Sequence, residues 1–164
     1  MILNIVILGL VTLERLAELP IARTNTQRLL ATGGREAAPG HYPLIVALHV
    51  AWLIALWWLA LGRPVNLPLL ALFGLVEIAR IWVLQTLGPR WTTRIIVVPG
   101  ETLVRRGPYR FLNHPNYAVV VAEIALLPLV FGLWRTALVF SLLNATLLKI
   151  RIHEENRALS ASSP

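Results

Sequence analysis

Hydrophobic residues along the chain are grouped into five long blocks separated by shorter polar segments. The blocks cover residues 2–19, 42–61, 67–87, 117–134 and 136–152. Each is close to the roughly 20 residues that a helix needs to cross the hydrocarbon core of a bilayer. The pattern predicts an all-α, polytopic membrane bundle of about five transmembrane helices, folded as a single membrane-integral domain over residues 1–164.

The segments between the blocks are polar and contain helix breakers. Residues 23–41 include Gly33, Gly34 and Pro39, which favours an interfacial loop with one short helix, and residues 63–66 predict a tight turn. The connection 88–116 contains four prolines and three glycines, too many for one helix. It is the largest predicted element that does not span the membrane.

The composition supports a membrane protein and excludes several other classes. The chain is 57% hydrophobic and 14% charged, with a mean hydropathy of +0.68, which is too apolar for a soluble domain of 164 residues. Its net charge of +7 does not predict nucleic-acid binding, because no basic patch with interleaved aromatic residues is present. There is no cysteine, so disulfides and cysteine nucleophiles are excluded.

Arginine and lysine residues are concentrated in alternate connections. Three arginines lie in residues 23–41, five lie in residues 88–116, and Lys149, Arg151 and Arg157 lie near the carboxyl end. The connections between them carry only Arg63 and Arg135. Because basic loops stay in the cytoplasm, we expect the amino terminus outside and the carboxyl terminus in the cytoplasm.

Ionisable residues inside the apolar blocks predict a polar layer within the membrane. They are Glu14, Arg15, Glu18, His49, Glu77, Arg80 and Glu123. Glu14, His49, Arg80 and Glu123 each lie six or seven residues from a predicted cytoplasmic boundary, a depth of about 10 Å. The layer is either the floor of a cavity open to the cytoplasm or a set of interhelical ion pairs. No metal site is expected, since the histidines show no ligand pairing at helical spacing.

Two motifs in the second half of the chain carry candidate chemistry. The sequence reads RGPYRFLNHPNY from Arg106 and RIHEENRAL from Arg151. The pair resembles the isoprenylcysteine carboxyl methyltransferase family over residues 99–159, which would form the cofactor-binding part. In the first half, ERLAEL at Glu14 and HYPLIVALH at His41 are similar to the bacterial branch of that family, whose members are often linked to polyketide synthases.

The resemblance implies an S-adenosylmethionine site near the cytoplasmic surface, with S-adenosylhomocysteine as product. Its residues would be Tyr109, Arg110, His114, Pro115, Asn116, Tyr117, Arg151, Glu154 and Glu155. Many relatives have arginine where this chain has Asn113 and glycine where it has Val119. The first difference removes a positive charge near the cofactor carboxylate, and the second removes a site of close helix approach.

The chemistry of these residues agrees with the resemblance. The cofactor carries a carboxylate, an ammonium, ribose hydroxyls and a sulfonium. Arginines and the histidine can bind the carboxylate, while Glu154 or Glu155 can bind the ammonium or the ribose. In a different role, the tyrosines would be interfacial belt residues and the arginines would face lipid headgroups.

The expected reaction is transfer of the methyl group to an oxygen of a lipophilic or prenylated acceptor. The protein itself would be surrounded by membrane lipid. A carboxylate acceptor needs a cation to position it, for which Arg80 and Arg151 are candidates. A phenol or enol, as on an alkylresorcinol or alkylpyrone, needs a base, for which Glu14, Glu123 and His49 are candidates. A small transporter, or a lipid-binding assembly protein, is the alternative from another class.

Overall fold

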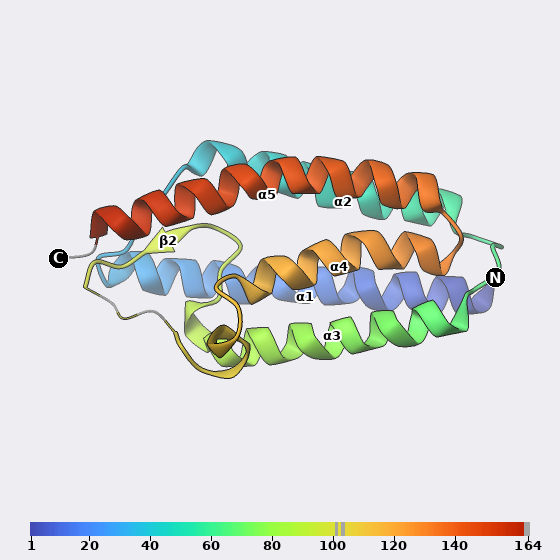
Figure 1. Ribbon diagram of the computed structural model, residues 1–164, viewed down its shortest axis with the longest axis horizontal. Helices are drawn as coiled ribbons and strands as arrows, with labels where there is room; N and C mark the ends of the chain where they lie inside the picture. Colours follow the sequence, from blue (N-terminus) through green and yellow to red (C-terminus); the bar gives the residue numbers. More distant parts are fainter. Residues whose placement is uncertain (101, 103, 163–164) are drawn as a thin grey trace.

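The computed structural model describes residues 1–100, 102 and 104–162, which form five long helices joined by short elements (Figure 1). The helices are α1 (Ile2–Ala31), α2 (Tyr42–Leu59), α3 (Leu67–Leu87), α4 (Pro115–Val130) and α5 (Trp134–Ser162). Between them lie the 3-10 turns η1 (Pro39–His41), η2 (Gly88–Arg90) and η3 (Gly107–Arg110), and the two-residue strands β1 (Arg35–Glu36) and β2 (Ile96–Val97). The predicted all-α class is therefore confirmed, with one small ribbon added.

The five helices run side by side along the long axis of the molecule, and the two termini lie at opposite ends (Figure 1). The short turns α2–α3 and α4–α5 lie at the amino-terminal end. The longer connections α1–α2 and α3–α4 lie at the carboxyl-terminal end together with the last turns of α5. The segments that contain most of the arginines therefore meet at one end of the bundle.

The hydrophobic core lies toward the amino-terminal end. Trp52 and Leu56 of α2, Leu8 of α1, and Leu127 and Phe131 at the end of α4 are almost completely buried there. The Asn4 amide donates hydrogen bonds to the carbonyls of Ala60 (2.7 Å) and Arg63 (2.9 Å) and so fixes the α2–α3 turn to α1. This end of the molecule is packed, which leaves the opposite end for a cavity.

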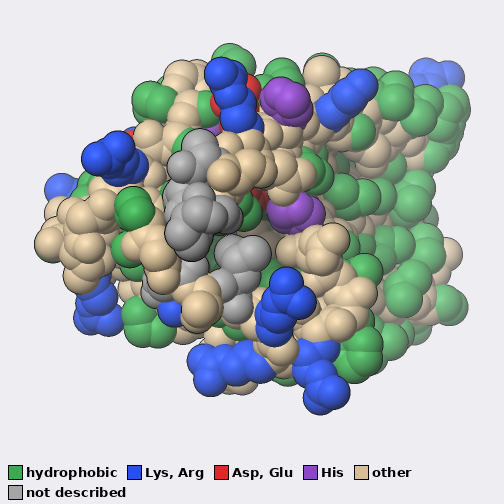
Figure 2. All heavy atoms as spheres, turned by 60° about the vertical axis from the view of Figure 1, so that its left-hand side comes forward, with side chains coloured by type: hydrophobic (Ala, Val, Ile, Leu, Met, Phe, Trp, Pro, Cys, Tyr) green, Lys and Arg blue, Asp and Glu red, His purple; other side chains and the backbone are tan. Residues whose placement is uncertain are grey.

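Large apolar side chains cover the outside of the helices. Leu10, Trp58, Leu75 and Leu142 are each more than 60% exposed. Figure 2 shows hydrophobic side chains along the helical flank, with many of the basic side chains, nearly all of them arginine, around the end that carries the connections. Two stretches, Pro39–Leu59 and Leu67–Arg90, are long and apolar enough to cross a membrane by length and composition. Such a surface suits lipid rather than water.

Three helix ends differ from the sequence prediction by more than two residues. The first helix does not end at residue 19 but continues past Pro20 to Ala31, so the predicted loop from residue 23 is wrong over its first nine residues. The reason is tertiary: Asn25, on the extension, donates hydrogen bonds to the carbonyls of Gly88 and Trp91 at 3.2 and 2.8 Å. Helix α4 stops at Val130, four residues early, and α5 continues through the acidic tail to Ser162.

Candidate functional site

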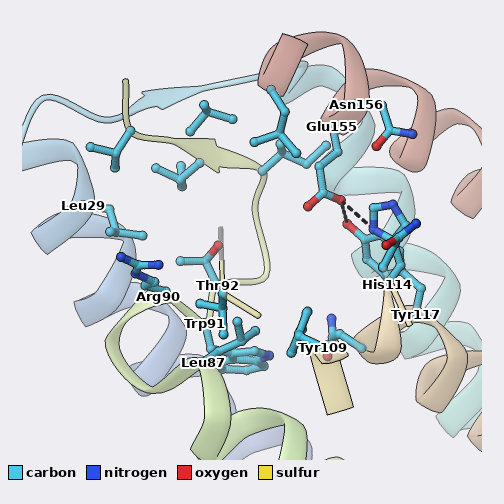
Figure 3. Close-up of a pocket in the computed structure, with 18 of the residues that line it drawn as sticks. Leu29, Leu87, Arg90, Trp91, Thr92, Tyr109, His114, Tyr117, Glu155 and Asn156 are labelled. Carbon is cyan, nitrogen blue, oxygen red and sulfur yellow. Dashed lines mark hydrogen bonds and ion pairs between the residues drawn. The ribbon is translucent and has the colours of Figure 1, made fainter. Parts of the chain in front are cut away.

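A cavity of about 930 Å³ lies at the arginine-rich end of the bundle (Figure 3). Its wall comes from the last turns of α1 and α3, strand β2, η3, the start of α4 and the end of α5. The volume is typical of a site for a small organic molecule. Segments from both ends of the sequence therefore enclose one space.

Tyr117 is the centre of a polar cluster on the cavity wall. Its hydroxyl donates a hydrogen bond to Glu155 Oε2 and accepts one from Arg151 Nε at 2.9 Å. The ring of His114 stacks on the Tyr117 ring with 5.3 Å between centroids, and His114 Nδ1 lies 3.7 Å from Glu155 Oε2. Arg151 is only 6% exposed. We call these four residues the Tyr117 cluster; they join the two sequence motifs.

Gly107 allows η3 to lie against the end of α3. Its φ is +55°, and a Cβ at this position would lie 2.6 Å from Thr86 Oγ1. A side chain here would therefore clash as well as strain the backbone. The Arg106 guanidinium also donates a hydrogen bond to the Thr86 carbonyl at 3.3 Å. The glycine of the first motif thus fixes the position of the tyrosine that follows it.

Tyr109 lies two positions after Gly107 and lines the cavity. Burial raises the pKa of the Tyr109 phenol above its usual value, and the negative charge of Glu155 raises it further, while a backbone hydrogen bond from Asn116 acts in the opposite direction. The phenol is therefore neutral at physiological pH. It is suited to donate a hydrogen bond to a ligand and not to act as a base.

A small ribbon forms part of the cavity wall above the helices (Figure 3). Strands β1 and β2 pair antiparallel, with Glu36 opposite Ile96. Arg94 binds both carboxylate oxygens of Glu36, at 2.8 and 2.9 Å, and its guanidinium lies 4.4 Å from the centroid of the Tyr42 ring. These contacts fix the α1–α2 connection to the α3–α4 connection, which keeps the ribbon in place.

Most residues of the expected cofactor site line this cavity. They are Tyr109, Arg110, His114, Asn116, Tyr117, Arg151 and Glu155. Pro115 and Glu154 do not line it. Pro115 is buried as the first residue of α4, and Glu154 points elsewhere because Arg151, Glu155 and Leu159, spaced by four residues on α5, turn toward the cavity instead.

Sequence reasoning missed the far wall of the cavity. Leu29 lines it, as do Arg90, Trp91 and Thr92 at the start of the long connection. Asn156, beside Glu155 on α5, was missed as well. Trp91 is 4% exposed, and its Nε1 has no hydrogen-bond partner among the residues that the structure describes. A buried donor beside a cavity suits a polar ligand atom. The only signal in the sequence was a tryptophan inside a polar, proline-rich connection.

The polar layer inside the bundle forms a separate cluster around Arg80. The Arg80 guanidinium binds both oxygens of Glu18, at 2.6 and 2.5 Å, and both oxygens of Glu123, at 3.0 Å. Arg15 Nη2 lies 3.1 Å from Glu123, and Glu14 lies 3.5 Å from Arg80. Side chains of α1, α3 and α4 are joined in this way. Of the two readings, the structure has interhelical ion pairs.

Among the candidate catalytic residues, Arg151 belongs to the Tyr117 cluster, Arg80, Glu14 and Glu123 belong to the cluster around Arg80, and His49 belongs to neither. Arg151 lines the cavity, whereas Arg80, Glu14, Glu123 and His49 do not. Of the two readings left open by the sequence, the cavity floor is not what the structure has, because Glu14 and Glu123 face the guanidinium groups of Arg80 and Arg15 instead. His49 Nδ1 lies 2.8 Å from the Ile45 carbonyl, one turn earlier on α2, so this nitrogen carries the hydrogen.

Comparison with known proteins gives a family match. The family model of the isoprenylcysteine carboxyl methyltransferase (ICMT) family matches residues 69–161. The chain is similar to the uncharacterized protein YpbQ of Bacillus subtilis (strain 168), with 37% identity over 96% of each chain. It is also similar to an uncharacterized protein of Haemophilus influenzae, with 26% identity over 92% of this chain and 91% of the relative. No solved structure matches significantly.

Proposed function

Since the chain belongs to the isoprenylcysteine carboxyl methyltransferase family, a family of membrane methyltransferases, we propose that it transfers a methyl group from S-adenosylmethionine to an oxygen of a lipophilic acceptor at the cytoplasmic face of the membrane. The Tyr117 cluster carries this proposal. It brings a buried cation, a carboxylate and two stacked rings from both sequence motifs onto the wall of one cavity of suitable size.

The cavity residues fit the groups of this cofactor. Arg110 and Arg151 provide positive charge for a carboxylate, and Glu155 provides negative charge for an ammonium or an acceptor for ribose hydroxyls. Trp91 adds a buried donor that has no partner within the described part of the chain. Groups of both signs therefore line the same space, as a zwitterionic nucleoside requires.

The bound cofactor would supply an activated methyl group, so the protein's task is alignment and exclusion of water. Arg151 is fixed by its hydrogen bond to the Tyr117 hydroxyl, and Tyr117 is fixed by Glu155. Where Arg110 holds the cofactor carboxylate, the Arg151 guanidinium is available to orient the oxygen of an acceptor. Strand β2 and the end of α5 form part of the cavity wall, which limits the directions from which water can enter.

Two classes of acceptor fit an oxygen-directed transfer. The first is a carboxylate, as on a prenylated cysteine, which is ionised at neutral pH and needs only Arg151 to position it. The second is the hydroxyl of an alkylpyrone or alkylresorcinol, which also needs a base. None of the three candidate bases lines the cavity: Glu14 and Glu123 pair with Arg80, and His49 lies outside the cavity wall. The cavity therefore favours the carboxylate acceptor, which needs no base.

The proposal includes a membrane arrangement. All five helices would cross the bilayer, with the amino terminus outside and the cavity in the cytoplasm. The alternation of the connections between the two ends of the bundle supports it, as does the concentration of arginines near the cavity. The exposed apolar flank of the helices supports it as well.

A methyl-transfer assay tests this function. Purified protein in lipid nanodiscs would be given S-adenosylmethionine with a radioactive methyl group and either N-acetyl-S-farnesylcysteine or a long-chain alkylpyrone. We expect label in one of the acceptors, loss of transfer in Glu155→Ala, and transfer retained in the matched variant Glu154→Ala, whose side chain does not line the cavity. Folded protein that labels neither acceptor would contradict the proposal.

A further inference from the structure

Residues 105–112 form a largely exposed segment that passes round the outside of the bundle at the end of α3 (Figure 1). A Cβ placed on Gly107 would lie 2.6 Å from Thr86 Oγ1 and 3.3 Å from Trp82 Nε1, both on α3. The Arg106 guanidinium also donates a hydrogen bond to the Thr86 carbonyl. The segment is therefore fixed to the last turns of α3. We call residues 105–112 the η3 segment.

Two large apolar side chains of the η3 segment lie outside the protein core. Phe111 is 76% exposed and Leu112 is 53% exposed. The last turns of α3, to which the segment is fixed, also expose apolar side chains: Ile78, Ile81 and Trp82 are each about half exposed or more. Phe111 and Leu112 thus extend an apolar surface that suits lipid, at the point where the helix ends and the headgroup layer would begin.

Three arginines lie next to these apolar side chains. Arg105, Arg106 and Arg110 are exposed, and within the described part of the chain no carboxylate is paired with any of them. The sequence has no aspartate or glutamate from residue 102 to residue 122. Anionic phospholipids of the cytoplasmic leaflet attract basic residues near the membrane surface. The segment therefore combines positive charge with apolar side chains, as an interfacial lipid-binding element does.

The proposed cofactor does not account for all three arginines. S-adenosylmethionine has one carboxylate, for which Arg110 is available in the cavity wall, and its ammonium and sulfonium groups are positive. Arg105 and Arg106 are thus left for a different anion. The phosphate groups of the lipid surface are the anions that a segment at the end of a membrane-crossing helix meets.

We infer that the η3 segment binds anionic phospholipid, with its two exposed apolar side chains between the lipids and Arg105 and Arg106 on the phosphate groups. The inference goes beyond the proposed methyl transfer and rests only on the proposed membrane arrangement. Because Tyr109 and Arg110 belong to the same segment and line the cavity, bound lipid would also hold this part of the cavity wall in place.

A fluorescent reporter tests this contact without any turnover. The chain has no cysteine, so Leu112→Cys can carry a single environment-sensitive nitrobenzoxadiazole group. In phosphatidylcholine nanodiscs, we expect added phosphatidylglycerol to shift its emission to the blue. Arg105→Gln with Arg106→Gln should raise the phosphatidylglycerol share needed for half of this shift by tenfold or more, since each arginine contributes roughly fivefold in affinity. The matched pair Arg23→Gln with Arg28→Gln, exposed on α1 toward the same end, should leave it unchanged.

A second variant keeps every arginine. Phe111→Ser should weaken the blue shift, whereas Leu30→Ser, at an exposed apolar position near the end of α1, should not. Emission that is the same with and without phosphatidylglycerol, or a shift unchanged in Arg105→Gln with Arg106→Gln, would overturn the inference. An equal shift caused by soluble glycerol phosphate in phosphatidylcholine would overturn it as well, because the arginines would then bind a free phosphate. A lipid-dependent shift in folded protein that binds no S-adenosylhomocysteine would contradict the proposed cofactor alone.

Discussion

At the scale of single residues, the Tyr117 hydroxyl links the two motifs. It accepts from Arg151 and donates to Glu155, residues that lie 34 and 38 positions further along the chain. Hydrogen bonds to charged groups are stronger than those between neutral groups. The hydroxyl therefore sets the position of both charged groups that would bind the cofactor.

Tyr117→Phe removes that hydroxyl and leaves the ring stacked on His114. We expect the affinity for S-adenosylhomocysteine to fall about tenfold to a hundredfold, because a hydrogen bond to a charged group contributes roughly 1.5 to 3 kcal/mol. Isothermal titration calorimetry would measure it. Tyr42→Phe is the control, since the Tyr42 hydroxyl bonds Thr93 and does not line the cavity. Equal affinities in the two variants would show that the Tyr117 hydroxyl does not contribute to cofactor binding.

The close approach of Gly107 to Thr86 can be tested by adding a methyl group. Gly107→Ala combines an unfavourable positive φ with a clash against Thr86, so η3 should shift and cofactor affinity should fall by at least tenfold. Gly132→Ala is a matched control, because Gly132 has a φ of +70° but no atom near an added Cβ. Calorimetry on both variants separates the clash from backbone strain; a normal affinity in Gly107→Ala would show that η3 tolerates displacement.

At the scale of elements, the Arg80 cluster joins three helices inside the apolar part of the bundle. Arg80 connects Glu18 of α1 with Glu123 of α4, and all three side chains are less than 10% exposed. Buried ion pairs are costly to break, because the remaining partner keeps an uncompensated charge. The cluster would therefore specify how α1, α3 and α4 are arranged.

Arg80→Leu should destabilise the protein by about 3 to 5 kcal/mol, since two buried carboxylates lose their main partner. Thermal unfolding in detergent, followed by tryptophan fluorescence, would measure the loss. Arg63→Leu, at an exposed position in the α2–α3 turn, should change stability by less than about 0.5 kcal/mol. An unchanged melting temperature together with lost methyl transfer would favour a catalytic role for Arg80 instead.

The elements also show what the sequence could predict. Hydrophobic blocks of membrane-crossing length located all five helices, because burial in lipid demands continuous apolar segments. They did not show that α1 continues to Ala31, since that extension depends on Asn25 bonding to η2 and the residue after it, more than 60 positions away. Depth along each helix placed Arg80, Glu14 and Glu123 at one level, but rotation about the axes decided which groups they face.

The candidate site was predictable where it is local in sequence. The GPYR and HPNY segments form η3 and the first turn of α4, so their residues reach the cavity together. Trp91 and Leu29 were not predictable, because they reach the cavity only through the packing of α1 and the long connection. Glu154 and Glu155 are neighbours in sequence, but successive side chains on a helix point about 100° apart around its axis. Only Glu155 therefore faces the cavity.

At the scale of the whole molecule, the cavity requires the α3–α4 connection and the end of α5 to lie on the same side of the membrane. The chain contains no cysteine, so single cysteines can report their side. We expect Arg110→Cys and Glu154→Cys in inside-out vesicles to react with a membrane-impermeant maleimide, and Arg63→Cys to react only in right-side-out cells. Opposite reactivity of the first two positions would exclude an enclosed cofactor.

The central claim is that this cavity binds S-adenosylmethionine. Calorimetric titration of the folded, detergent-purified protein with S-adenosylhomocysteine tests it most directly. We expect saturable binding with one molecule per chain, lost in His114→Ala and kept in Glu154→Ala, whose side chain does not line the cavity. Folded wild-type protein that gives no binding heat at any temperature tried, and no thermal stabilisation by the same ligand, would contradict it.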